Sequence, residues 1–246
     1  MRVALLSDIH ANLEAFEACL AHAATRGVDG YALLGDFVGY GADAVAVVET
    51  VMRMAAEGAI ALKGNHDAAI ERSESYFNEP ARAALDWARE TLDAGQQRFL
   101  AQLPLIAERP PAFFVHASAV APQRWDYIDS PRAARRCVDA AGQTHTFCGH
   151  VHEQCLYFGT RNGRMGEFRP QSGNPIPVRG SRQWLAAVGS VGQPRDRNPA
   201  AAYAMFDDRR LEITFFRVPY DHHAAADKIR RAGLPASLAY RVEAGI

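Results

Sequence analysis

Five short motifs along the chain contain the side chains that most readily bind metal ions or transfer protons. They are Asp8-Ile9-His10, Gly35-Asp36, Gly64-Asn65-His66-Asp67, His116 and Gly149-His150-Val151-His152. Carboxylate, carboxamide and imidazole groups supply the oxygen and nitrogen ligands that divalent transition metals accept. Each motif alone is weak, since a single histidine after a strand is more often a hydrogen-bonded structural residue. The five motifs in this order predict one metal site.

The elements that must position these motifs are short strands, because each motif directly follows an apolar run of strand length. The runs are Val3–Leu6, Tyr31–Leu34, Ala59–Leu62, Ala112–Val115 and Thr146–Cys148. Apolar spacing and capping residues predict helices over Leu13–Ala24, from Asp43 to Gly58, and over Pro80–Ala94 with Gly95 at the exit. Strands that alternate with helices are mainly parallel, and the loops at their carboxyl ends converge on one crevice. We therefore expect the five motifs to meet.

The rest of the chain predicts a second sheet. Its strand-like runs follow one another without intervening helices, which favours antiparallel pairing, and they are Cys155–Phe158, Trp184–Val188, Tyr203–Phe206 and Leu211–Val218. The stretch Thr160–Arg182, which contains glycine, proline and arginine, predicts a hairpin with long solvated loops, and a helix is expected near His222–Ala232. No linker or sharp change of composition divides the chain, so residues 1–246 are interpreted as a single domain.

The composition excludes several classes of protein. The 246 residues carry a formal net charge of -1 and no basic block, so the sequence offers no electrostatic track for nucleic acid. No run approaches the roughly 20 apolar residues of a membrane span, and no charged leader precedes the first strand, so a cytoplasmic location is expected. The four cysteines form no CxxC pair and are interpreted as buried reduced thiols. None of these features predicts the oligomeric state.

The ordered motifs resemble those of the calcineurin-like metallophosphoesterase superfamily. The segments Ser7–Asn12, Gly35–Gly41 and Gly189–Asp196 are similar to those of its small bacterial and archaeal phosphodiesterase branch, whose members are often labelled diadenosine-tetraphosphatase-like. The similarity extends through Tyr220-Asp221 and Ala232–Pro235, so it covers nearly the whole chain. The resemblance implies an α/β fold, a four-layer α/β/β/α sandwich with two packed mixed sheets and a site for two metals at one edge.

The resemblance also implies a role for each motif residue. The first metal is expected to bind Asp8, His10, Asp36 and His152, and the second is expected to bind Asp36, Asn65, His116 and His150. Asp36 would bridge both metals, and His66 would stay off them as the general acid. The cofactors are then two divalent transition-metal ions, with manganese as our prediction and iron, zinc, cobalt or nickel as alternatives. The imidazole ligands disfavour a purely magnesium or calcium site.

These roles predict a hydrolase. Water that bridges two cations ionises near neutral pH, so hydroxide would attack phosphorus while His66 protonates the leaving alkoxide. We predict a metal-dependent phosphodiesterase for a small phosphorylated substrate, with nucleotides among the candidates. The alternatives are a phosphomonoesterase, including a Ser/Thr phosphoprotein phosphatase, and a dinucleoside polyphosphate hydrolase. Phosphoprotein phosphatases have Asp-Arg where this chain has Gly39-Tyr40. That arginine binds the phosphate dianion of a monoester, so its absence argues against the phosphomonoesterase alternative. A non-catalytic scaffold is disfavoured because no ligand is missing.

Three further residues are candidate substrate contacts. Tyr40 either lines the mouth of the site or packs within its loop, and Arg195 either reaches a phosphate or is a solvated surface residue. Asn12 is a weaker candidate, because capping the first helix is the favoured role for it. Asp67 is a candidate to orient His66. Ala117 stands where relatives carry glycine, which is expected to alter the local loop only slightly.

Overall fold

Two six-stranded mixed sheets form the centre of the protein. The computed structural model describes residues 1–71, 76–161, 163–180 and 182–246. The first sheet has the order β3-β2-β1-β11-β12-β9, formed by Ile60–Ala61, Gly30–Leu33, Arg2–Leu6, Ala201–Asp207, Glu212–Val218 and Pro175–Pro177. The second has the order β4-β5-β6-β10-β7-β8, formed by Ile106–Arg109, Ala112–Val115, His145–Cys148, Gln183–Val188, Gln154–Gly159 and Gly166–Phe168.

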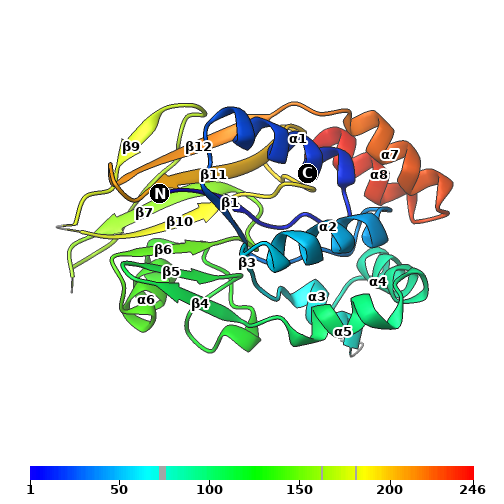
Figure 1. Cartoon of the computed structure of the whole chain (residues 1–246), viewed down its shortest axis with the longest axis horizontal. Coiled ribbons are helices and arrows are strands. Elements are labelled where there is room, and N and C mark those ends of the chain that lie inside the picture. Colours follow the sequence, from blue (N-terminus) through cyan, green and yellow to red (C-terminus); the bar gives the residue numbers. More distant parts are fainter. Residues whose placement is uncertain (72–75, 162, 181) are drawn as a thin grey trace.

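Eight α-helices among the described residues surround the sheets (Figure 1). They are α1 (Leu13–Thr25), α2 (Ala44–Ala56), α3 (Asn65–Glu71), α4 (Glu79–Thr91), α5 (Ala94–Gln102), α6 (Pro131–Ala141), α7 (His222–Arg231) and α8 (Ala236–Ala244). A short 3₁₀ turn, Pro122–Arg124, precedes α6. Within the described part of the chain, no helix combines the length and apolar character needed to cross a membrane.

The core confirms the predicted four-layer sandwich. Between the two sheets, Leu5 and Phe215 of the first pack in one cluster with Phe114 and Phe147 of the second. The outer face of the first sheet is covered by a larger cluster, to which the helices α1, α2, α4, α5, α7 and α8 contribute. The outer face of the second sheet packs against α6. The α/β/β/α layering therefore follows from two apolar faces on each sheet.

The expected division of the strands between the sheets was wrong. β5 and β6 pair in parallel with each other, and β10 pairs in parallel with β6, so a late strand joins early ones. In the first sheet, β1 pairs antiparallel with β11. Each sheet thus takes strands from both halves of the chain. An apolar pattern shows that a segment is a strand, but it does not specify which distant strand lies beside it.

Two local predictions also need correction. The stretch Thr160–Arg182 is not one hairpin, because β8 pairs with β7 whereas β9 crosses to β12 of the other sheet; residues 162 and 181 of that stretch lie outside the described residues. Gly95 does not end a helix. α4 ends at Thr91, and Asp93 starts α5 through a reciprocal capping box with Gln96, so Gly95 lies in the first turn of α5.

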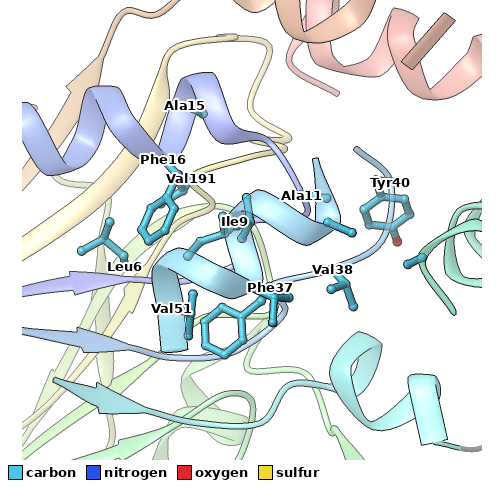
Figure 2. Close-up of a cluster of buried hydrophobic side chains, with 14 of the residues drawn as sticks. Leu6, Ile9, Ala11, Ala15, Phe16, Phe37, Val38, Tyr40, Val51 and Val191 are labelled. Carbon is cyan, nitrogen blue, oxygen red and sulfur yellow. The ribbon is translucent and has the colours of Figure 1, made fainter. Parts of the chain in front are cut away.

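The strand-end motifs are held in place by apolar residues inside them. Ile9 lies between two predicted ligands and Phe37 follows a third, and both side chains are fully buried. Figure 2 shows them in the same cluster as Leu6, Phe16 and Val191. The polar side chains of these motifs therefore project from a backbone that the hydrophobic core fixes.

The packing between the sheets predicts unequal effects of one substitution at two phenylalanines. Phe215 is fully buried between the sheets, whereas Phe168 on β8 is 46% exposed. We expect Phe215→Ala to lower the free energy of unfolding by about 3 to 5 kcal/mol, because it leaves a cavity. Phe168→Ala should change it by less than about 0.5 kcal/mol. Urea denaturation followed by fluorescence measures both, and equal effects would contradict the assigned core.

Candidate metal centre

The five motifs meet at the edge where strands of both sheets end. Two groups of three buried side chains, Asp8 with His10 and His152, and Asp36 with His116 and His150, each bring their ligand atoms within 4.8 Å of one another. The first sheet supplies the residues that follow β1, β2 and β3, and the second supplies those that follow β5 and β6. Residues separated by more than a hundred positions are thereby brought into one cluster.

Two imidazoles of the first group face each other through their acceptor nitrogens. His10 donates from Nδ1 to the Val38 carbonyl at 3.1 Å, and His152 donates from Nδ1 to the Gln193 carbonyl at 2.6 Å. A carbonyl only accepts, so both Nε2 atoms carry lone pairs in the neutral rings. These two Nε2 atoms lie 3.2 Å apart, and Asp8 Oδ1 lies 3.3 Å from that of His152. Three acceptors this close require a positive charge between them.

The second group has the same character. His116 donates from Nδ1 to the Leu34 carbonyl at 2.9 Å, which leaves Nε2 as an acceptor. That atom lies 3.3 Å from Asn65 Oδ1, 3.2 Å from His150 Nδ1 and 3.4 Å from Asp36 Oδ2. Burial lowers the pKa of His116, but the Asp36 carboxylate outweighs it and raises the pKa to about 9. The Asp36 carboxylate therefore favours a positive charge within this group.

Asp36 stands between the two groups. Its Oδ2 atom lies 3.4 Å from His116 Nε2 and 3.8 Å from His10 Nε2, and its Oδ1 accepts the backbone N–H of His66 at 2.8 Å. Burial would raise the pKa of this carboxyl, but His116 and His66 hold it well below its ordinary value. An ionised carboxylate that faces both groups has the position required of a bridging ligand.

Asp67 supports the cluster from behind. Its carboxylate accepts three backbone N–H groups, those of Asp36 at 2.8 Å, Phe37 at 2.8 Å and Gly64 at 2.9 Å. The prediction that Asp67 orients His66 is wrong, because these bonds fix two strand-end loops to each other. Backbone donors that converge on one carboxylate are not visible in a sequence.

The backbone of several candidate ligand residues adopts the left-handed conformation, which glycine adopts more readily than other residues. Asp8, Asp36, His150 and His152 have φ of 54°, 56°, 67° and 65°, in the left-handed region that few other residues occupy. The neighbouring Gly149 permits this arrangement, since a Cβ there would lie 1.9 Å from Ser7 Oγ and 2.5 Å from Asp8 Oδ2. The glycines of these motifs are thus needed because neighbouring atoms leave no room for a Cβ atom, and they do more than form turns.

His66 lies beside the cluster in an aromatic setting. Its ring makes edge contacts with His10 at 4.8 Å and Phe77 at 4.7 Å between centroids, and its Nδ1 has no hydrogen-bond partner among the described residues. A Cβ at Gly39 would lie 2.3 Å from that Nδ1. Burial lowers the pKa of His66 to about 4. His66 also comes within ligand distance of His10 and Asp36, so the geometry allows either an acid or a ligand.

A cleft of about 420 Å³ opens above the cluster. Tyr40 and Arg195, two predicted substrate contacts, line it. Asn12 does not line this cleft, and its side chain caps α1 by accepting from Ala15 N at 3.1 Å and donates to the Gly192 carbonyl at 2.9 Å. The capping role is therefore the one the structure supports.

Three other residues that line this cleft were not predicted from the sequence. The Tyr127 ring stacks on that of His150 at 4.1 Å, and the Trp125 ring meets that of His116 at 5.9 Å. Arg241 reaches the cleft from α8. Two aromatic residues close together in a loop could have indicated a binding site in the sequence. Arg241 had none, since only the tertiary position of its helix brings it here.

The chain is similar to known phosphoesterases. The sequence model of the calcineurin-like phosphoesterase superfamily domain matches residues 1–209. A solved metallophosphoesterase from Sphaerobacter thermophilus is 35% identical, with a TM-score of 0.88 over 100% of this chain and 99% of that one. An uncharacterized protein of Methanocaldococcus jannaschii is 34% identical over 99% of this chain and 98% of its own length. A hypothetical protein of Pyrococcus horikoshii shares the fold at 20% identity and a TM-score of 0.79, over 100% and 98% of the two chains.

The contacts of Asp67 predict the effect of replacing its carboxylate. In Asp67→Asn an amide N–H₂ group must face a backbone N–H donor, which should cost about 1 to 3 kcal/mol of stability. Because the loops that carry Asp36 and Gly64 lose their anchor, metal content should also fall. Chemical denaturation and elemental analysis measure the two effects. Asp129→Asn, at an exposed position, is the control, and an Asp67→Asn protein indistinguishable from it would disprove the anchoring role.

Proposed function

The chain belongs to the calcineurin-like phosphoesterase superfamily, and we propose that it is a metal-dependent phosphodiesterase acting on small phosphorylated substrates, nucleotides among them. One observation carries the proposal. Two groups of buried acceptor side chains, joined by Asp36, lie at the base of a cleft lined by aromatic and arginine side chains. Acceptors that face each other need cations, and cations at the base of such a cleft attract a phosphate.

The donor set fits two transition-metal ions. The ligands that would hold them are those predicted from the sequence, Asp8, His10, Asp36 and His152 for one ion and Asp36, Asn65, His116 and His150 for the other. When bound, the ions supply Lewis acidity, which activates water and neutralises phosphoryl charge. Cys148 lies nearby, but its side chain packs in the apolar cluster beneath α6, and among the described residues it belongs to none of the groups that could hold a metal. Mixed oxygen and nitrogen ligands without thiolate suit manganese, which is our choice, and they also suit iron, zinc, cobalt and nickel.

His66 is the group we assign to proton donation. In the absence of ligands its imidazole is neutral at neutral pH, because burial lowers its pKa to about 4. A phosphate bound beside the ring favours the charged imidazolium. Uptake of the proton would then accompany substrate binding, and the departing oxygen would receive it.

The aromatic wall favours a substrate with an aromatic or heterocyclic group. Tyr127, which is 52% exposed, presents its ring at the mouth of the cleft, and Trp125 lies beside the second group of ligands. Flat rings of this kind stack on nucleobases. This observation supports a nucleotide diester as the substrate class.

A second candidate function is phosphomonoester hydrolysis. The sequence argument against it was the tyrosine at position 40, where a phosphoprotein phosphatase has a cation. In the folded chain, Arg195 and Arg241 lie near that tyrosine, with Cζ atoms 5.9 Å and 5.7 Å from the ring centroid. These cations weaken the argument, since a dianion could bind to them.

A substrate comparison tests the proposal. With Mn²⁺ present, we expect kcat/KM for bis-p-nitrophenyl phosphate to exceed that for p-nitrophenyl phosphate by about tenfold or more. The reason is that cations and aromatic rings around the cleft accommodate a second ester group. Nitrophenolate release measures both rates, with metal-free protein as the control. A clear preference for the monoester would select the second candidate function.

Two variants separate the proposed acid from the proposed ligands. His66→Ala should keep its metal content and lose about 10²- to 10⁴-fold in turnover, because a general acid is absent. Asp36→Ala should lose metal as well as turnover, because both groups share this carboxylate. Elemental analysis together with kinetics on a diester with a poor leaving group measures the two outcomes. Loss of one metal from His66→Ala would identify His66 as a ligand and reject the acid assignment.

A further inference from the structure

Two arginines from different parts of the chain converge on one side of the cleft. Arg195 belongs to the loop that follows β10, and Arg241 belongs to α8 near the end of the chain. Both line the cleft and both are half-buried. Their guanidinium groups lie near the same ring, that of Tyr40, with centroid distances of 5.9 Å and 5.7 Å.

Neither guanidinium has a carboxylate partner among the described Asp and Glu residues. Arg195 donates from Nη2 to Gln193 Oε1 at 3.3 Å and weakly to Tyr40 Oη at 3.5 Å, and its buried Nε has no partner within the described part of the chain. Arg241 donates from Nε to the Ile246 carbonyl at 2.9 Å. By contrast, the half-buried Arg217 is held by Asp196 at 2.8 Å. The two cleft arginines therefore keep donors available.

The two positive charges also repel each other. Burial lowers the pKa of Arg241, and the charge of Arg195 lowers it further. Partly buried cations that have no Asp or Glu partner among the described residues are costly to hold together, so an anion that enters the cleft stabilises the pair. Two planar guanidinium forks match the oxygens of a phosphate group.

The arginines lie beside the candidate metal centre without contacting it. Tyr40 links the two, since its ring lies 4.6 Å from that of His10 and within cation–π range of both guanidiniums. Neither guanidinium is hydrogen-bonded to a candidate ligand or to His66. An anion held between the arginines therefore occupies a place next to the group that is hydrolysed.

We propose that Arg195 and Arg241 form a binding site for a second phosphate of the substrate, distinct from the phosphoryl group that is cleaved. This inference rests on the proposed function and narrows its substrate class to phosphate esters with at least two phosphate groups. Arg241 lies beyond residues 1–209, the part that matches the superfamily. Arg195 lies within that part, so the site combines one arginine from the matched region with one from α8.

The first test measures anion binding without metals. Protein treated with a chelator is titrated with inorganic pyrophosphate in a calorimeter. Arg195→Gln and Arg241→Gln should each weaken binding by about tenfold or more, since each removes a charge-assisted contact. Arg231→Gln, on an exposed position of α7, removes the same charge outside the cleft and should bind like the wild type. Unchanged binding by both cleft variants, with thermal unfolding midpoints equal to the wild type, would overturn the proposal.

The second test uses a matched pair of substrates with Mn²⁺-loaded protein. The p-nitrophenyl esters of thymidine monophosphate and thymidine diphosphate differ by one phosphate group. Arg241→Gln should lower kcat/KM about tenfold or more for the diphosphate ester, and about threefold or less for the monophosphate ester. Arg241→Lys keeps the positive charge but loses the planar fork of the guanidinium. Its kcat/KM for the diphosphate ester should lie between the values of the wild type and of Arg241→Gln. Equal losses on both esters would show that the arginines hold the cleaved phosphoryl group, and would reject a separate site.

The two tests separate this inference from the proposed function. If wild-type protein hydrolyses neither ester while pyrophosphate binding depends on both arginines, the phosphodiesterase proposal fails and the anion site stands. If both esters are hydrolysed while neither binding nor selectivity depends on the arginines, the anion site fails and the phosphodiesterase proposal stands.

Discussion

The arrangement of the candidate centre is governed by the repulsion between buried acceptors. Carboxylates and neutral imidazoles approach one another within about the distance of a hydrogen bond, but no hydrogen atom lies between several of them. The imidazole Nε2 atoms of His10 and His152, 3.2 Å apart, are the clearest case. Taking such groups out of water is unfavourable unless a positive charge compensates. Backbone carbonyls that accept from the opposite ring nitrogens force the lone pairs inward.

The two-sheet architecture supplies the backbone that makes this arrangement possible. Loops from adjacent strands are tied directly to one another, as in the bonds from Asp8 N to the Gly35 carbonyl and from Gly149 N to the His116 carbonyl. A further loop, after β10, contributes Ser190, whose hydroxyl donates to the Asp8 carbonyl at 2.8 Å. The centre is therefore built at the seam between the sheets. Neither sheet alone carries all of the ligands.

The clustering of the candidate ligand residues could be predicted from the sequence because each of them follows an apolar strand, and the ends of these strands meet in the fold. The pairing of strands could not, since β5 and β10 carry no mark of the sheet that they join. Asp67 was misassigned because its partners are backbone N–H groups, which every residue possesses. Arg241 was missed because its contribution depends on where α8 packs, a property of the whole fold. The local sequence pattern thus predicted which residues form the candidate centre better than it predicted the strands and side chains that surround that centre.

The left-handed backbone at Asp8, Asp36, His150 and His152 has a consequence for the way the protein acquires its ions. These dihedral angles are imposed by the hydrophobic core and by the close contacts of the neighbouring glycines, which belong to the folded chain itself. The candidate ligands are therefore expected to be preorganised, so that metal binding would require little rearrangement of the main chain. An ion that enters the site would then meet side chains already held in position, and binding it would require no local unfolding.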